Sequence, residues 1–182
     1  IVSVDIINKL RLLKGVRKML SCEEAWKGLS SPSMSEYVKY MYITVSRYFG
    51  EAIVVTQEVD DIISSPIVKE AIITNSDCKI LLDQKKYMNK FDGIQSMLGL
   101  TDKEKSQILS INLANHPGRK YKEVWIGLNG VQSAVYATEV SAAEYLTYTT
   151  EDSEKTEVFA RAEELGGDVE LAIKRLAETK YK

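Results

Sequence analysis

The sequence predicts an α/β fold: a parallel sheet flanked by helices, followed by an antiparallel hairpin and a helical tail. Short apolar runs at residues 16–22, 52–57 and 78–82 alternate with helical patterns of about a dozen residues, as in parallel sheets covered on both faces. Between two later apolar runs, Asn129 and Gly130 predict a type I′ hairpin turn, because both residues accept positive φ angles.

The composition indicates a folded globular protein with one core and a small appendage. Of the 182 residues, 45% are apolar and 27% are charged, which excludes a disordered chain. The net charge of -2 gives no overall positive field, so any contact with nucleic acid or an anionic membrane has to be local. No run reaches the ~18 apolar residues of a membrane span, and no signal peptide is visible.

The cysteines and the histidine exclude a zinc site by their number and spacing. Cys22 and Cys78 lie in apolar runs and are expected to be free thiols in a reducing cytoplasm. The chain begins at Ile1, inside an apolar pattern, so we expect it to be a fragment of a longer protein.

The first half of the chain is expected to alternate between helices and strands. Apolar spacing predicts a helix over residues 1–13 that ends near Gly15. A Ser-rich loop at residues 30–33 can cap a helix with an apolar face over residues 34–49, which Gly50 closes.

The second half is expected to begin with helices and to end in a hairpin and a tail. Thr101 and Glu104 form a capping box at the start of one helix, and Asp168 caps the last helix. We divide the chain into a main domain, residues 1–140, and a helical appendage, residues 141–182. A helical stretch after residue 57 is interrupted by Pro66 and continues to about Asn75. Helical patterns over 85–98 and 102–113 then precede strands over 123–128 and 131–140.

Acidic residues end the first predicted strand. Glu23 and Glu24 follow an apolar run directly, and ligands bind at the carboxyl edge of open α/β sheets. The alternative is that both are surface residues that open a loop. Thr56 and Gln57 end the next strand, where a glutamine can hydrogen-bond both water and a phosphate oxygen; the alternative for Gln57 is a polar strand cap.

These motifs resemble the TraG-type conjugation ATPases that energise type IV secretion. KMLSCEEAWK at residues 18–27 resembles their Walker B segment, which usually reads DEAW after an apolar run. Thr56 and Gln57 match the family's TQ motif in order and spacing. Two later segments, residues 99–104 and 118–121, resemble the family's C-terminal blocks.

The resemblance implies a RecA-like P-loop NTPase domain that uses ATP and Mg²⁺ in the intact protein. In that family the position of Glu23 orients water on Mg²⁺, the position of Glu24 aligns the attacking water, and Gln57 acts as a sensor. Thr56 is implied to contact the nucleotide. The family implies a ring, a hexamer, that works with other secretion subunits at the cytoplasmic face of the bacterial inner membrane, with DNA as a candidate cargo.

The sequence departs from the family pattern in two places. Glu23 stands where the family usually has Asp, one methylene shorter. No GxxxxGK[ST] occurs in the 182 residues, so the phosphate cradle and its lysine are missing. The family places that motif upstream. We therefore expect the fragment alone to bind no cofactor and to hydrolyse no ATP.

The segment over residues 118–121 contains a candidate arginine finger. Arg119 could reach a neighbouring subunit's γ-phosphate, or it could belong to a solvated basic turn with Lys120 and Lys122. Arg47 is a weaker candidate, because the helix dipole alone explains a cation at a helix end. His116, beside a proline in the same turn, is expected to be structural.

The aromatic residues could serve either core packing or ligand binding. Trp26 follows the acids and is expected to pack. The tyrosines of the helix over residues 34–49 could stack on single-stranded DNA, but core packing or a subunit interface is the default. They are Tyr37, Tyr40, Tyr42 and Tyr48.

The main hypothesis is therefore the C-terminal part of an ATPase that energises conjugative DNA transfer. The alternatives are a non-catalytic RecA-like domain that docks secretion components or DNA, and a related DNA-pumping translocase.

Overall fold

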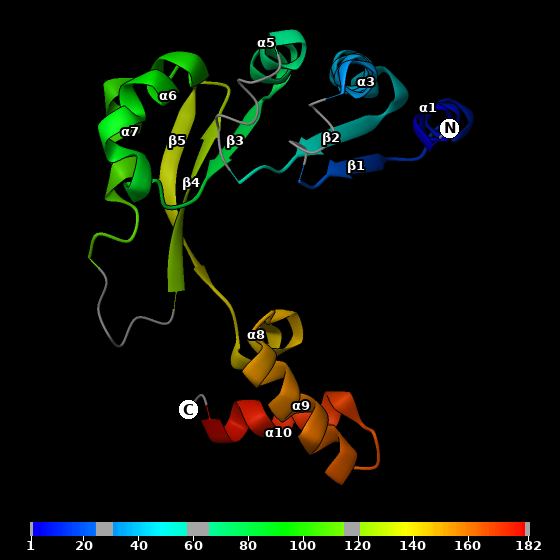
Figure 1. The fold of residues 1–182 in the computed structure, drawn as a ribbon, viewed down its shortest axis with the longest axis vertical. Coiled ribbons are helices and arrows are strands. Elements are labelled where there is room, and N and C mark those ends of the chain that lie inside the picture. Colours follow the sequence, from blue (N-terminus) through cyan, green and yellow to red (C-terminus); the bar gives the residue numbers. More distant parts are fainter. Residues whose placement is uncertain (1, 25–30, 58–65, 115–120, 181–182) are drawn as a thin grey trace.

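The computed structural model describes residues 2–24, 31–57, 66–114 and 121–180. Figure 1 shows two small sheets side by side, with helices over them and a separate helical group at the C-terminal end. The α-helices are α1 (Val2–Leu12), α3 (Pro32–Thr44), α5 (Pro66–Asn75), α6 (Phe91–Leu98), α7 (Asp102–Ser110), α8 (Ala142–Tyr148), α9 (Asp152–Glu164) and α10 (Val169–Lys180). The 3₁₀ helices are η1 (Val45–Tyr48) and η2 (Lys85–Lys90). The strands are β1 (Lys18–Cys22), β2 (Gly50–Val54), β3 (Cys78–Leu81), β4 (Tyr121–Leu128) and β5 (Gln132–Glu139).

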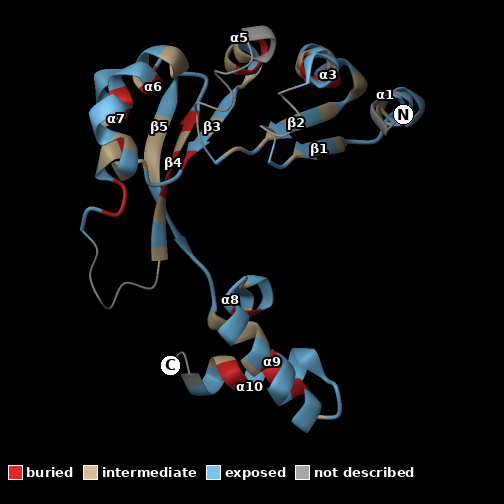
Figure 2. Cartoon of the chain, in the orientation of Figure 1, coloured by how far each residue is buried: buried red, intermediate tan, exposed pale blue. Residues whose placement is uncertain are grey.

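The first sheet is a parallel pair, β1 and β2, in register from Lys18 opposite Gly50 to Cys22 opposite Val54. One face is covered, because Val38 of α3 and Ile72 of α5 form a buried cluster against β2. The other face is open among the described residues, and Met19 is 69% exposed there. Figure 2 shows the exposed residues of this pair. The structure confirms the predicted α/β class with a parallel sheet and flanking helices, and among the described residues the helices cover one face of this pair.

The second sheet has the order β3-β4-β5 and is antiparallel throughout. Helices α6 and α7 cover it through a cluster centred on Phe91, Ile108 and Trp125, each nearly inaccessible to solvent. The predicted strand over residues 78–82 exists, but it pairs with β4, and no ladder joins it to β2 within the described residues.

The predicted hairpin is confirmed in its turn geometry. Asn129 and Gly130 have φ angles of 48° and 65°, and the Val131 amide donates to the Leu128 carbonyl at 2.9 Å. The register pairs Leu128 with Gln132, so Val131 lies outside the ladder and is 89% exposed.

Helix boundaries follow their capping residues. The capping box of Thr101 and Glu104 is present, and Asp168 accepts a hydrogen bond from the Leu171 amide at 2.9 Å. The helix predicted over residues 34–49 divides into α3 and η1 and ends at Phe49, which is left-handed with φ 58°. The helix predicted over residues 85–98 likewise divides into η2 and α6.

The C-terminal helices pack on one another through a cluster of Leu146, Val158 and Leu176, one from each helix. Within the described residues, no helix is long and apolar enough to cross a membrane.

Candidate functional site

The parallel register brings the two polar strand ends to one edge. Glu23 and Glu24 follow directly after Cys22, the last ladder residue of β1, and Thr56 and Gln57 follow one residue after its partner Val54. The Val55 amide donates to the Cys22 carbonyl at 2.9 Å, which extends the pairing one step further. Glu23 and Glu24 after β1 therefore lie at the same edge as Thr56 and Gln57 after β2.

The backbone at Glu24 is unusual for its residue type. Glu24 has φ 48°, in the left-handed region that disfavours side chains by ~1–2 kcal/mol. Glu23 and Glu24 are exposed, so core packing does not explain this conformation. Backbone strain of this kind is concentrated at functional sites, which makes Glu24 a stronger candidate than an ordinary surface acid.

Cys22, at the end of β1, lies near Tyr37 and Tyr42 of α3. Burial raises the pKa of the Cys22 thiol, so Cys22 is a neutral thiol at pH 7 rather than a nucleophile. Burial likewise raises the pKa of Tyr37 and of Tyr42. The Tyr37 hydroxyl is buried and has no hydrogen-bond partner among the described residues. These three groups therefore bring no charge to the neighbouring strand ends.

The edge suits a hard cation reached through water. Carboxylate and hydroxyl oxygens are the donors that Mg²⁺ prefers, and Mg²⁺ usually keeps several of its waters. Among the described residues, no three His, Cys, Asp or Glu side chains gather closely enough to enclose a metal ion. Any Mg²⁺ at Glu23, Glu24 and Thr56 would therefore be held through its waters rather than in a protein cage.

The other residues considered for the site lie partly outside the described residues. Arg119, His116 and Trp26 lie outside the described residues. Arg47 is exposed in η1, which precedes β2, whereas Gln57 follows that strand. Arg47 therefore lies at the opposite end of β2 from the acidic edge.

The later block of residues 99–104 has a structural function in this fold. Gly99 is the left-handed C-cap of α6, with φ 65°, and Leu100 is buried in the core of the second sheet. Thr101 and Glu104 exchange the hydrogen bonds of the capping box. Gly99, Leu100 and Glu104 also line a shallow recess beside Trp125. The resemblance at this block therefore concerns the start of α7 rather than the acidic edge.

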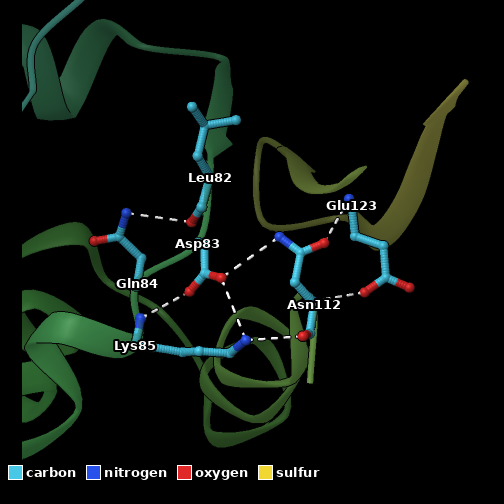
Figure 3. A network of polar contacts seen from close by, with 6 residues as sticks. All are labelled: Leu82, Asp83, Gln84, Lys85, Asn112 and Glu123. Atoms are coloured by element: carbon cyan, nitrogen blue, oxygen red, sulfur yellow. Dashed lines mark hydrogen bonds and ion pairs between the residues drawn. The ribbon is translucent and has the colours of Figure 1, made fainter. Parts of the chain in front are cut away.

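A polar network that the sequence analysis did not single out lies after β3 (Figure 3). Asn112 and Glu123 are joined by two hydrogen bonds, one in each direction. The backbone amide of Asn112 donates to Glu123 Oε2 at 2.7 Å, and the backbone amide of Glu123 donates to Asn112 Oδ1 at 3.0 Å. Lys85 Nζ donates to the Asn112 carbonyl at 2.8 Å. Asp83 accepts from the Lys85 amide at 3.0 Å and from Asn112 Nδ2 at 3.5 Å.

This network joins the segments after β3 and after α7 to η2 and β4. Burial would raise the pKa of Asp83, but hydrogen bonds from Lys85 and Asn112 and the charge of Lys85 lower it overall. Asn112 is only 8% exposed and has φ 55°. One feature of the sequence could have indicated this position: an asparagine just after a predicted helix, because asparagine accepts the left-handed conformation at helix ends.

Comparisons with known proteins agree with this fold. The model of the TraG P-loop domain family matches residues 1–180. The structure of VirB4 of Thermoanaerobacter pseudethanolicus matches with a TM-score of 0.52 and 19% identity, over 85% of this chain and 37% of that one. The chain thus spans little more than a third of the VirB4 chain. None of the curated proteins compared with the chain matches it. Because the family model covers nearly the whole sequence, the chain belongs to the TraG P-loop domain family.

Proposed function

We propose that this chain is the part of a type IV secretion ATPase that activates water for ATP hydrolysis. The observation that carries the proposal is the register of β1 and β2, which sets Glu23 and Glu24 beside Thr56 and Gln57. Parallel strands that end together in acids and amides form the edge at which α/β domains bind ligands.

Each side chain has a distinct role in the proposal. Glu23 holds water in the shell of a Mg²⁺ ion, with one methylene more reach than the usual aspartate. Glu24 aligns the attacking water and takes its proton, and Gln57 hydrogen-bonds the same water or a phosphate oxygen. Thr56 contacts the nucleotide. When bound, ATP supplies the phosphoryl group, and its Mg²⁺ offsets the phosphate charge.

The phosphate-binding loop has to come from sequence outside these residues. No GxxxxGK[ST] occurs in the chain, whereas the matched family is a P-loop domain. Two open strand edges support this proposal: β2 is paired only with β1, and β3 only with β4, among the described residues. A further strand that leads into a phosphate-binding loop fits such edges.

The biological setting is proposed from the family. The intact ATPase is expected to assemble as a hexameric ring with other secretion subunits at the cytoplasmic face of the inner membrane, where it drives conjugative DNA transfer. Arg119 is proposed as the finger that reaches a neighbouring subunit's nucleotide.

The test is Glu24→Gln in the intact ATPase, with Glu36→Gln as the matched control. Glu36 is an exposed carboxylate of α3, so its change alters net charge equally. Loss of a general base should lower kcat by on the order of 10²-fold or more, with nucleotide binding unchanged. Full turnover in Glu24→Gln would refute this role. An intact protein that binds no nucleotide would instead favour a non-catalytic docking domain.

A further inference from the structure

The C-terminal helices form an arm that stands apart from the two sheets. Helices α8, α9 and α10 pack on one another through Leu146, Val158 and Leu176. Figure 1 shows that the end of β5 leads into this group and that both sheets lie away from it. The faces of the arm that do not serve its own small core are therefore open to a contact outside this copy of the chain.

One face of the arm combines exposed aromatic and acidic side chains. Phe159 of α9 is 58% exposed, and Tyr148 at the end of α8 is 80% exposed. Glu163 lies four residues after Phe159 on α9, and Asp152 lies seven residues before it. Helical periodicity therefore sets both exposed carboxylates on the face of Phe159, turned away from the buried Val158.

A second exposed apolar surface, the corner, lies at the amino ends of β1 and β2. Arg11 of α1 donates to the Tyr40 hydroxyl at 2.8 Å, and Lys18 donates to the carbonyl of Tyr48 in η1. These contacts join the end of α1, the start of β1 and η1 into one surface. Figure 1 shows α1 at the outer margin of the molecule, far from α8, α9 and α10, so the arm of the same copy does not reach the corner.

The corner presents aromatic and aliphatic side chains. Phe49 is 59% exposed and left-handed, with φ 58°, a conformation that a bulky residue adopts only at a cost. Tyr40 and Tyr48 lie half-buried beside Arg11. The exposed aliphatic side chains of the corner are Leu12, Leu13 and Val16.

The arm and the corner belong to parts of the chain with opposite charge. Residues 1–50 contain eight basic and four acidic side chains, whereas residues 141–182 contain six basic and ten acidic ones. At the corner, Glu51 is ion-paired with Arg17, and both side chains are largely exposed. The cations of the corner are Arg11, Lys14, Arg17, Lys18 and Arg47.

We propose that the arm of one copy docks on the corner of a second copy of this chain. Phe159 and Tyr148 cover the apolar side chains of the corner, and Asp152 and Glu163 meet its cations. The contact is heterologous, because it joins different surfaces of the two copies, so it repeats from copy to copy and either closes as a ring or continues as a filament. It goes beyond the proposed function, since the acidic edge lies at the other end of β1 and β2 and stays free.

Single-stranded nucleic acid is the rival occupant of the corner. Tyr40, Tyr48 and Phe49 can stack on bases, and the cations can bind phosphates. Nucleic acid would leave the aliphatic side chains of the corner in water, however, and would give the aromatic side chains of the arm no partner. A second copy covers both apolar surfaces at once and matches their charges, and this favours the second copy.

The experiment is sedimentation velocity of the 182-residue chain without nucleotide, across the micromolar range at low and high salt. Self-association is expected to rise with concentration and to weaken with salt. The corner variant is Lys14→Glu with Arg47→Glu, and the arm variant is Phe159→Gln with Glu163→Lys. Each should raise the dissociation constant roughly tenfold or more. All four side chains are exposed, so both variants should keep the fold, which circular dichroism checks.

A mixture of the two variants gives the most direct test. The corner variant keeps an intact arm, and the arm variant keeps an intact corner. An equimolar mixture should therefore form a heterodimer and nothing larger, which also shows that both variants are folded. Lys90→Glu with Lys103→Glu makes the same charge change as the corner variant at exposed sites of η2 and α7, and should leave self-association unchanged.

Four results would overturn the proposal. One is a wild-type chain that stays monomeric throughout the micromolar range. Another is an equal loss of self-association in the Lys90 and Lys103 control, and a third is a mixture that forms no heterodimer. The fourth is a corner variant that loses binding to a labelled single-stranded oligonucleotide while its self-association is unchanged, which would assign the corner to nucleic acid. None of these measurements involves ATP hydrolysis, so the docking proposal and the proposed function fail independently.

Discussion

Replacing Gly127 with alanine should unfold the second sheet locally, because the Trp125 ring occupies the space of a side chain there. A Cβ added at Gly127 would lie 2.3 Å from the Cη2 atom of Trp125 and 2.8 Å from Cζ2. Trp125 is 1% exposed, and its indole nitrogen donates to Gln107 Oε1 at 3.1 Å. The ring can move only by leaving this packed position and this hydrogen bond.

The magnitude follows from these two losses. Overpacking a core typically costs ~1–3 kcal/mol, and a lost hydrogen bond costs about 1 kcal/mol more. Gly127→Ala should therefore lower the free energy of unfolding by roughly 2–4 kcal/mol. Urea unfolding followed by Trp125 fluorescence measures this change, in a Trp26→Phe background so that one indole reports.

Gly93→Ala is the matched control, since it makes the same chemical change in the first turn of α6. A Cβ at Gly93 meets nothing within 4 Å, so alanine should stabilise the helix by about 0.5–1 kcal/mol. The two substitutions should thus have opposite signs. If Gly127→Ala were as stable as the wild type, the close packing of Trp125 against β4 would be refuted.

Further predictions concern the strained turn, the polar network and a helix cap. Glu24→Gly should be about 1 kcal/mol more stable than Glu24→Ala in urea unfolding, because both lack the carboxylate and differ in the cost of φ 48°; equal stabilities would argue against strain at Glu24. Asp83→Asn should destabilise the protein at pH 7. The pKa of the Asp83 carboxyl is lower in the folded protein than in the unfolded chain, where it is near 3.8. The ionised carboxylate therefore stabilises the fold above that pH, and this stabilisation is lost as the pH falls from there through the lowered folded pKa. The difference between Asp83→Asn and wild type should therefore shrink in acid, and a constant difference would contradict the assigned ionisation. Thr101→Ala should cost about 1 kcal/mol in thermal unfolding, through the lost cap of α7; no change would show that the cap bonds are not made in solution.

The sequence predicted the local features of the fold, such as helix caps and the hairpin turn, because these depend on residues close together in the chain. Thr101, Asp168 and the Asn129 turn carry their own hydrogen bonds or φ preferences, so their effects were visible without the fold. The apolar runs located the strands for the same reason. The predicted helix boundaries were wrong where tertiary contacts decide them. At Phe49 a left-handed residue ends η1, and no sequence rule favours phenylalanine in the left-handed conformation.

Long-range pairing was less accessible to sequence reasoning. The run at residues 78–82 was expected to continue a parallel sheet, yet β3 pairs with β4, which lies about forty residues later. The network of Asp83, Asn112 and Glu123 was missed because its members lie far apart in the sequence, after β3, after α7 and in β4. The acidic edge was predictable as two strand ends, but only the register shows that they lie together.

The chemistry of the acidic edge places a requirement on the rest of the site. Glu23 and Glu24 are adjacent carboxylates, and a triphosphate beside them would be repelled unless positive charge lies between. Arg17, Lys18 and Arg47 lie at the opposite ends of β1 and β2. Among the described residues, the edge brings together carboxylates and no cation, so the proposed role of Glu24 requires that Mg²⁺ and a basic side chain outside these residues supply the charge. In that proposal water activation and nucleotide binding are separable functions, which is why Glu24→Gln should abolish turnover and leave binding intact.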